Sequence, residues 1–197
     1  MMHNFFDLTL SERKRLVKSA KDQNVTLMSR WESLNFEPIG AWSARAQFAA
    51  TLLGRQASVA DIGCGLMPLE RFLEAGTAYI PLDVVARDSR TTVVDLNLQE
   101  LPALGAKAIA ALGLIEYIYD VPRLLARMAD TCSVVILSYN CTDFFPDLNT
   151  DDRLGNAWVN QYSLDELQNV FMAVGLQIQE RVQFNAKQTL WKLSSAK

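Results

Sequence analysis

The chain has 197 residues, half of them hydrophobic, and a formal net charge of -3. This length suits one domain with a sizeable core and is short for two. The acidic balance argues against a protein whose main task is to hold a nucleic-acid backbone, because that affinity needs clustered Lys and Arg.

Cysteine usage and the N-terminus bear on the compartment. Cys64, Cys132 and Cys141 show no CxxC spacing, so neither a disulfide framework nor a zinc cluster is expected. The opening MMHNFFDLTLSERKR has charges where a signal peptide needs an apolar core, and no stretch approaches the roughly 20 apolar residues of a membrane span. We therefore expect a soluble, cytoplasmic, unprocessed protein with no membrane partner.

The first quarter of the chain predicts helices. Thr9 or Ser11 can cap a helix over 11–23, and residues 41–53 space their apolar side chains at helical intervals. Between them, RWESLNFEPIG (30–40) is typical of a connection. We expect a single domain over 1–197, with a helical cap over 1–55 and the core over 56–197.

A basic run on the first predicted helix is the one feature that favours RNA. Leu16, Val17 and Ala20 would form its inward stripe, which leaves the charges on a solvated face. That interpretation is preferred to RNA binding. The charges are Arg13, Lys14, Arg15, Lys18 and Lys21.

After Gly54 the sequence alternates between short apolar runs and amphipathic segments. Such alternation favours a parallel sheet covered on both faces, which is a doubly wound α/β fold. The predicted strands are 58–62, 78–84, 91–96, 107–114 and 133–139, and the predicted helices between them are 66–76 and 118–130.

The C-terminal part predicts one more helix and a hairpin. Ser163 and Glu166 form a capping box for a helix that Gly175 would end. Residues 176–184 and 188–194 alternate like two strands joined by FNAKQ. The sheet is therefore expected to be mostly parallel, with an antiparallel hairpin at the C-terminus.

The loop ADIGCG (60–65) follows the first predicted strand, where ligands bind in open α/β sheets. Two glycines let the backbone approach a ligand closely. A P-loop would need Lys and Ser or Thr after Gly65, and a dinucleotide fingerprint GxGxxG breaks at Pro68. Asp61 directly before the turn also suits a positively charged ligand better than a pyrophosphate. S-adenosylmethionine, with its sulfonium and ammonium, fits that description.

The motif DxGCG, present as Asp61, Gly63, Cys64 and Gly65, resembles the first motif of the class I S-adenosylmethionine-dependent methyltransferases. Met67 departs from the family, which often has another glycine there. The resemblance extends over residues 57–195 and implies a Rossmann-like fold, methyltransferase activity and S-adenosylmethionine as the cofactor.

Further elements of the resemblance follow in order. Asp83 ends the second strand, where the family's acid takes both ribose hydroxyls, and Asp95 ends the third, where the family reads the adenine amino group. LGLIEY (112–117) resembles the family's LGVLEY or VLEH element and would border the methionine part and the reaction cleft. The resemblance thus implies that the cofactor residues are Asp61, Gly63, Cys64, Gly65, Asp83, Val84, Asp95, Leu96, Leu112 and Gly113.

Methyl transfer to a hydroxyl or ammonium needs alignment of the acceptor and removal of a proton. The one histidine, His3, stands at the N-terminus, so the base is expected among Glu116, Tyr117 and Asp143. Tyr117 falls where VLEH has its histidine. No further ligands predict a metal beside Glu116.

Aromatic residues are candidates for an acceptor pocket between the cap and the sheet. Each could equally pin the cap to the core. The candidates are Trp31, Trp42, Tyr139 and Trp158, with Phe36 beside them. By elimination we expect a small-molecule acceptor, such as a hydroxyl of a sugar or another metabolite. The alternatives are a non-catalytic binding or assembly protein of the same fold and an RNA methyltransferase.

Overall fold

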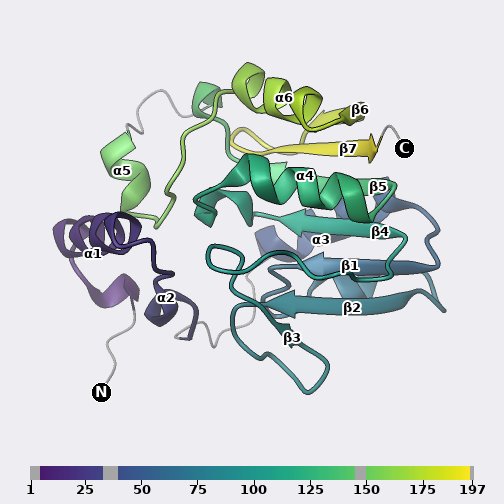
Figure 1. The fold of residues 1–197 in the computed structure, drawn as a ribbon, viewed down its shortest axis with the longest axis horizontal. Helices are drawn as coiled ribbons and strands as arrows, with labels where there is room; N and C mark the ends of the chain where they lie inside the picture. Colours follow the sequence, from purple (N-terminus) through teal and green to yellow (C-terminus); the bar gives the residue numbers. More distant parts are fainter. Residues whose placement is uncertain (1–4, 33–39, 145–149, 196–197) are drawn as a thin grey trace.

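A computed structural model describes residues 5–32, 40–144 and 150–195 (Figure 1). Its centre is one seven-stranded sheet in the order β3-β2-β1-β4-β5-β7-β6. Neighbouring strands from β3 to β5 are parallel, and β7 runs antiparallel to both β5 and β6. The strands are β1 Ser58–Ile62, β2 Ala78–Asp83, β3 Thr92–Val93, β4 Ala108–Leu112, β5 Val134–Tyr139, β6 Leu176–Gln183 and β7 Thr189–Ser195. The doubly wound sheet and the terminal hairpin are confirmed.

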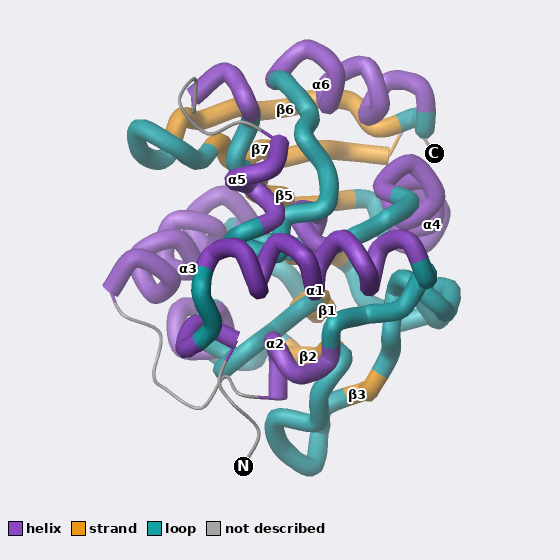
Figure 2. The backbone as a smooth tube through the Cα atoms, turned by 90° about the vertical axis from the view of Figure 1, so that its left-hand side faces the viewer, coloured by secondary structure: helices purple, strands orange, loops and turns teal. Residues whose placement is uncertain are grey.

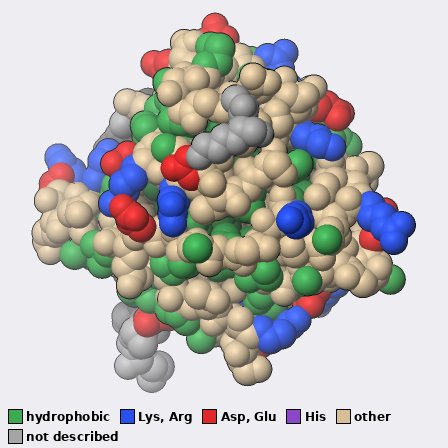
Figure 3. Space-filling view, turned by 45° about the vertical axis from the view of Figure 1, so that its right-hand side comes forward, with side chains coloured by type: hydrophobic (Ala, Val, Ile, Leu, Met, Phe, Trp, Pro, Cys, Tyr) green, Lys and Arg blue, Asp and Glu red, His purple; other side chains and the backbone are tan. Residues whose placement is uncertain are grey.

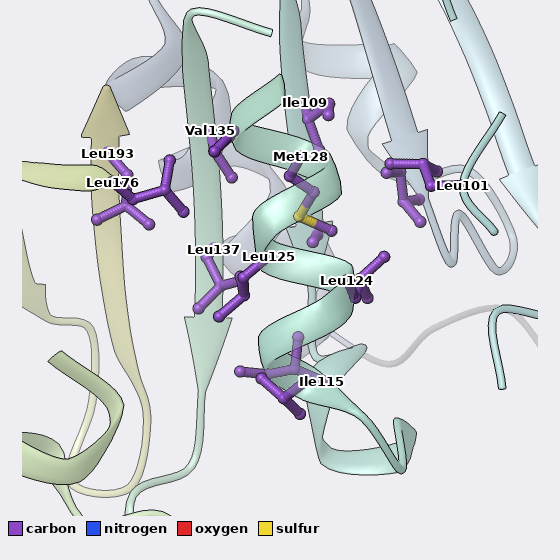
Figure 4. Close-up of a cluster of buried hydrophobic side chains, with 14 of the residues drawn as sticks. Leu101, Ile109, Ile115, Leu124, Leu125, Met128, Val135, Leu137, Leu176 and Leu193 are labelled. Atoms are coloured by element: carbon purple, nitrogen blue, oxygen red, sulfur yellow. The ribbon is translucent and has the colours of Figure 1, made fainter. Parts of the chain in front are cut away.

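Helices cover both faces of the sheet, which explains why its central strands read as continuous apolar runs. Residues 40–53, expected in the cap, form α3 (Gly40–Leu53), which packs on one face against β4, β5 and β7. The other face carries α4 (Val121–Thr131) and α6 (Leu164–Ala173). In Figure 4, α4 lays Leu124, Leu125 and Met128 over Ile109, Val135 and Leu137.

The caps of these helices follow the sequence. The Ser163 side chain accepts from the Glu166 amide, which confirms the capping box of α6, and Gly175 takes a positive φ of 80° just after its end. The Asp120 side chain caps α4 by accepting from the Arg123 amide. Such caps satisfy amides that have no partner within the helix.

A cap lies beyond the carboxyl ends of β1, β2 and β4, and Figure 2 shows α1 crossing in front of them. It consists of α1 (Leu10–Asp22), α2 (Met28–Glu32) and, beside α1, α5 (Thr150–Leu154). Thr9 caps α1 in a reciprocal box with Glu12, which decides between the two predicted caps. Short 3-10 turns complete the structure at η1 (Phe5–Asp7), η2 (Leu69–Phe72), η3 (Ile115–Tyr117) and η4 (Thr142–Phe144).

Three predicted segments differ in the structure. The helix expected over 66–76 is only η2, because Met67 still has a left-handed φ of 55° and Leu73 is already extended. The third strand, expected over 91–96, pairs only at Thr92–Val93, since Asp95 begins a turn by accepting from the Asn97 amide. The connection expected over 30–40 begins inside α2, and residues 33–39 lie outside the described ranges.

Candidate functional site

A cavity of about 230 Å³ lies where the strand ends meet the cap. The loops after β1, β2, β3 and β4 line the side of the cavity next to the sheet. Residues of α1, α2 and α3 and residues 157–159 line the rest. Fifteen residues singled out in the sequence contribute to its walls, namely Trp31, Trp42, Asp61, Gly63, Cys64, Gly65, Asp83, Val84, Asp95, Leu96, Leu112, Gly113, Glu116, Tyr117 and Trp158. The structure thus brings together side chains from seven separate segments.

The glycine loop presents bare backbone to this cavity. Gly63 and Gly65 have φ of 70° and 53°, a left-handed conformation that glycine adopts without cost. The amides of Gly63 and Cys64 both donate to the Leu82 carbonyl, at 2.8 and 2.9 Å, which ties the loop to β2. A Cβ on Gly63 would lie 2.9 Å from the Leu114 side chain, whereas the space beside Gly65 is open. Gly65 therefore leaves room for a ligand against its backbone.

Asp61 begins this loop and is only 3% exposed. The Tyr79 hydroxyl donates to its Oδ2 at 2.6 Å. Burial raises the pKa of Asp61 to about 7, against the opposing effects of the Tyr79 hydrogen bond and the Arg45 charge. Tyr79 reaches Asp61 from the neighbouring parallel strand, a pairing that the sequence did not reveal.

Asp83 holds the loop from β2. Its Oδ2 accepts from the Gly65 amide at 2.9 Å, and its Oδ1 accepts from the Val85 amide at 3.0 Å and from Arg87 at 3.3 Å. Asp83 and Arg87 are both about nine-tenths buried in this ion pair. Because an ionised carboxyl has roughly four acceptor sites, Asp83 can accept one further hydrogen bond from a ligand.

Asp95 connects the core to the cap. Its Oδ1 accepts from the Thr26 hydroxyl at 2.8 Å and from the Asn97 amide at 3.0 Å. The Asn97 side-chain amide donates to Thr26 Oγ1 at 3.0 Å and to the Tyr117 carbonyl at 3.1 Å. These bonds use Oδ1 of Asp95, and Asp95 is one of the residues that line the cavity.

Glu116 and Arg45 are two buried charges without full hydrogen bonding. Glu116 is 1% exposed; its Oε1 accepts from the Asn140 amide at 3.1 Å and from the Asn140 side chain at 2.8 Å. Neither Glu116 Oε2 nor Arg45 Nε has a hydrogen-bond partner among the described residues. Burial raises the pKa of Glu116 and lowers that of Arg45, and each charge opposes the other's shift.

Arg45 was missed in the sequence because α3 carries no motif. Its guanidinium lies against Gly113, where a Cβ would come within 2.6 Å of Nη1. Gly113 has a φ of 67°, and its amide donates to the Ser138 hydroxyl at 2.8 Å. A glycine at this position therefore allows the close approach of Arg45 as well as the turn.

Aromatic side chains form the cap side of the cavity. Trp31 meets Tyr117 edge to face at 4.6 Å between ring centroids, and Trp158 Nε1 donates to the Tyr117 hydroxyl at 3.3 Å. The buried guanidinium of Arg30 lies 4.7 Å over Trp31 and 4.5 Å over Phe6. Trp31 and Trp158 thus both pack the cap and line the cavity.

Two predicted site residues do not line the cavity. Tyr139 is fully buried, donates to Asn160 at 2.6 Å and accepts from Arg153 at 3.0 Å. Asp143 accepts from the Leu164 amide at 2.5 Å, at the start of α6. Tyr139 ends β5 and Asp143 follows it, both at the correct end of the sheet, but their side chains hold neighbouring loops. Phe36 lies outside the described residues.

The basic helix makes contacts inside the molecule. Arg13 donates to the Gly155 carbonyl at 2.9 Å, Lys14 pairs with Asp152 at 2.8 Å and Lys21 donates to the Val159 carbonyl at 2.8 Å. The expectation of a solvated basic face is therefore wrong for Arg13 and Lys14, which are half-buried, whereas Lys21 is exposed as expected. Leu16, expected to face inward, is 39% exposed. On the face shown in Figure 3, acidic and basic side chains are interspersed.

Metal binding and membrane insertion are two further questions for the described ranges of the chain. No group of three or more His, Cys, Asp or Glu residues is placed to hold a metal ion there. None of the helices described is both long enough and apolar enough to cross a membrane.

No protein-family model and no curated protein matches the sequence. Solved structures do match the fold. The methyltransferase CalO1 of calicheamicin biosynthesis, solved with S-adenosylhomocysteine, is 18% identical with a TM-score of 0.62, over 98% of this chain and 70% of CalO1. An S-adenosylmethionine-dependent methyltransferase from Mesorhizobium loti is 15% identical with a TM-score of 0.61, over 76% of this chain and 97% of that one.

A third similar structure is the O-methyltransferase NcsB1 of neocarzinostatin biosynthesis, solved with S-adenosylmethionine and 2-hydroxy-5-methyl naphthoic acid. It is 18% identical with a TM-score of 0.59, and the match covers 94% of this chain and 59% of NcsB1. At such identities the likeness shows the fold: this chain has the fold of the S-adenosylmethionine-dependent methyltransferases, as the resemblance implied.

Proposed function

We propose that this protein is an S-adenosylmethionine-dependent methyltransferase that acts on a small molecule. The observation that carries the proposal is the cavity itself, which gathers the glycine loop, Asp83, Asp95 and Gly113 at the carboxyl ends of four parallel strands. That is where open α/β sheets bind their ligands. The methyltransferases of the same fold support the assignment.

The residues present fit this cofactor. The open space at Gly65 admits a ligand against bare backbone. Asp83 would take a ribose hydroxyl with its remaining acceptor site, and Asp95 Oδ2 would accept from the adenine amino group, with Val84 and Leu96 beside them in the wall. Asp61, near the end of β1, lines the cavity and would lie within reach of the positive charge of the cofactor. Met67 takes a left-handed φ of 55°, the conformation that the family's glycine would adopt freely.

Arg45 completes the cofactor site. Its guanidinium lies beside Gly113. Gly113 belongs to the part of LGLIEY (112–117) that is expected to border the methionine part of the cofactor. A guanidinium binds a carboxylate through two parallel hydrogen bonds. We therefore assign Arg45 to the carboxylate of the methionine part, which would give its buried Nε a hydrogen-bond acceptor.

Glu116 is the proposed base. S-adenosylmethionine, when bound, supplies a methyl group activated by a positively charged sulfur. Glu116 Oε2 would take the proton of the acceptor hydroxyl, and Asn140 would hold Oε1 in place meanwhile. The raised pKa of Glu116 brings this carboxyl closer to the range in which general bases are efficient. The geometry does not bring Asp143 into this role.

Titration calorimetry with S-adenosylmethionine and S-adenosylhomocysteine, with NAD as the control ligand, tests the proposal. We expect micromolar binding of the two adenosyl ligands and none of NAD. Arg45→Gln should weaken binding about tenfold or more, because a hydrogen bond to a charged group contributes about 1.5–3 kcal/mol. Arg55→Gln, on an exposed arginine, is the matched control. Equal binding of NAD, or no binding of either adenosyl ligand, would refute the proposal.

Turnover separates an enzyme from a binding protein of the same fold. Release of S-adenosylhomocysteine should be measured with a panel of hydroxylated small molecules, in the wild type and in Glu116→Gln. We expect the variant to bind cofactor with unchanged affinity and to lose about 100-fold or more in kcat, the usual contribution of a general base. Cofactor binding without turnover of any acceptor would favour the non-catalytic alternative.

A further inference from the structure

A buried polar network holds the turn that carries Glu116. It includes Tyr139, Arg153 and Asn160, and none of these three is among the residues that line the cavity. Arg153, in α5, is 1% exposed, and Tyr139 is fully buried. Burial of a guanidinium costs free energy unless the group is hydrogen-bonded. The partners of Arg153 therefore indicate what the network holds in place.

Arg153 is the centre of this network. Its Nη2 donates to the Asn140 carbonyl at 3.1 Å and to the Tyr139 hydroxyl at 3.0 Å. Its Nε donates to the Asn160 carbonyl at 3.1 Å. A planar guanidinium holds its acceptors in fixed relative directions, which an ammonium on a flexible stem does not. Arg153 thus fixes the two asparagines relative to each other.

Asn140 joins Arg153 to the proposed base. Its backbone amide and its side-chain amide both donate to Glu116 Oε1, at 3.1 and 2.8 Å, while its carbonyl accepts from Arg153. Glu116 Oε2 has no hydrogen-bond partner among the described residues. The orientation of the Glu116 carboxyl therefore depends on Asn140, and Arg153 restrains Asn140 at its carbonyl.

Asn160 holds the backbone of the same turn. Its side-chain amide donates to the carbonyls of Ile115 and Ile118, one before and one after Glu116 in the chain. The Tyr139 hydroxyl donates to Asn160 Oδ1 at 2.6 Å, which orients that amide. The backbone and the carboxyl of Glu116 are therefore both held by one buried network. Such a network stabilises more as a unit than its separate hydrogen bonds would.

We propose that Arg153 is a positioning residue for methyl transfer, which acts through Asn140 to hold the Glu116 carboxyl in the orientation that takes the proton of the acceptor. The inference rests on the proposed function, because that function makes Glu116 the base. Arg153 does not line the cavity, so it would touch neither the cofactor nor the acceptor. Its loss should change the proton affinity of Glu116 and leave the cofactor site intact.

The proton affinity of Glu116 reports on Asn140. Burial raises the pKa of Glu116, and the hydrogen bonds from Asn140 oppose that rise because they favour the ionised carboxylate. A loosened Asn140 should therefore raise the pKa further. Other groups that interact electrostatically with Glu116 come from α3, η3, β5 and the segment after β5, and an Arg153 variant retains all of them. These groups are Arg45, Tyr117, Tyr139 and Cys141.

NMR measures the pKa of Glu116 directly. Ligand-free protein labelled with ¹³C at the glutamate side-chain carboxyl is titrated, and the Glu116 signal is the one missing from Glu116→Gln. Arg153→Lys keeps the charge but loses the planar fork, and it should raise this pKa by about one unit, a tenfold change in proton affinity. Arg127→Lys is the matched control. It makes the same change on an α4 arginine whose Nε donates to the Leu101 carbonyl, and it should leave the pKa unchanged.

A second background tests the route through Asn140. In Asn140→Ala, the change Arg153→Lys should shift the pKa by only about a third as much as in the wild type or less, because the two substitutions act on one path. Arg153→Met serves as a second variant should Arg153→Lys fail to fold. The same pair of backgrounds then separates a through-space effect of the lost charge, which would persist without the Asn140 side chain.

Affinity for S-adenosylhomocysteine, measured by calorimetry, should change less than about twofold in Arg153→Lys. The inference would be overturned by an unchanged Glu116 pKa in that variant, by equal shifts in the two backgrounds, by an equal shift in Arg127→Lys, or by a loss of S-adenosylhomocysteine affinity of about tenfold. The NMR titrations need no ligand. Failure of the wild type to bind S-adenosylhomocysteine would instead count against the proposed function.

Discussion

Burial of Asp61 should make the stability of the protein depend strongly on pH. Burial raises the pKa of this carboxyl from an ordinary 3.8 to about 7. Between these values the folded protein keeps a proton that the unfolded chain has released, so the free energy of unfolding falls as pH rises. The slope is about 1.4 kcal/mol per pH unit, and over roughly three units the loss is about 4 kcal/mol. This stabilisation is fully present below pH 3.8 and is lost by the time pH has risen through 7.

Asp61→Asn isolates this contribution. Asparagine still offers an oxygen to the Tyr79 hydroxyl but cannot ionise. The free energy of unfolding in urea is measured for both ligand-free proteins from pH 4 to pH 8. The value for the variant minus that for the wild type should rise by about 4 kcal/mol across that range. Asp22→Asn, at the exposed end of α1, is the matched control and should follow the wild type. Parallel curves for wild type and Asp61→Asn would show that Asp61 does not hold a proton in the folded state.

Three further substitutions test other parts of the structure. Asp83→Ala should lower the free energy of unfolding by about 3–5 kcal/mol in urea, because it leaves a buried arginine without its partner; a merely local role in ligand binding would leave the urea midpoint unchanged. Gly113→Ala should displace Arg45 and weaken S-adenosylhomocysteine binding in calorimetry, and unchanged affinity would remove Arg45 from the site. Leu125→Ala should cost about 2–5 kcal/mol of stability in urea with cofactor affinity unchanged, and a smaller loss would contradict its place between α4 and the sheet.

The sheet could be predicted well from the sequence because the residues of each strand show by themselves that the strand is buried. Parallel strands covered on both faces need uninterrupted apolar runs, and SVADI and SVVILSY are such runs. The glycine loop was predictable for a similar reason, since its glycines and acid are contiguous. The helix over 66–76 was wrong because apolar periodicity does not show that the backbone is still left-handed at Met67.

The cap side of the cavity could be predicted only in part. Trp31 and Trp158 stood out as aromatics, but Arg30 and Arg45 carry no local signal that they face inward. Their positions depend on how the cap packs over the strand ends, which is a tertiary effect. Conversely, Tyr139 ends a strand and Asp143 follows it, both at the correct edge of the sheet. Their position along the chain could not show that hydrogen bonds to Asn160 and the Leu164 amide would occupy their side chains.

Asn97 joins the strand ends to the cap. Asp95 Oδ1 accepts from the Asn97 amide, and the Asn97 side chain donates both to Thr26 of the cap and to the Tyr117 carbonyl. The residue proposed to bind adenine therefore helps to fix both the cap and the backbone of Tyr117. A ligand on Asp95 would restrain this network further, at an entropic cost that a second ligand in the cavity would then not have to meet again. Because such coupling is reciprocal, the arrangement favours cooperative binding of the two ligands in either order.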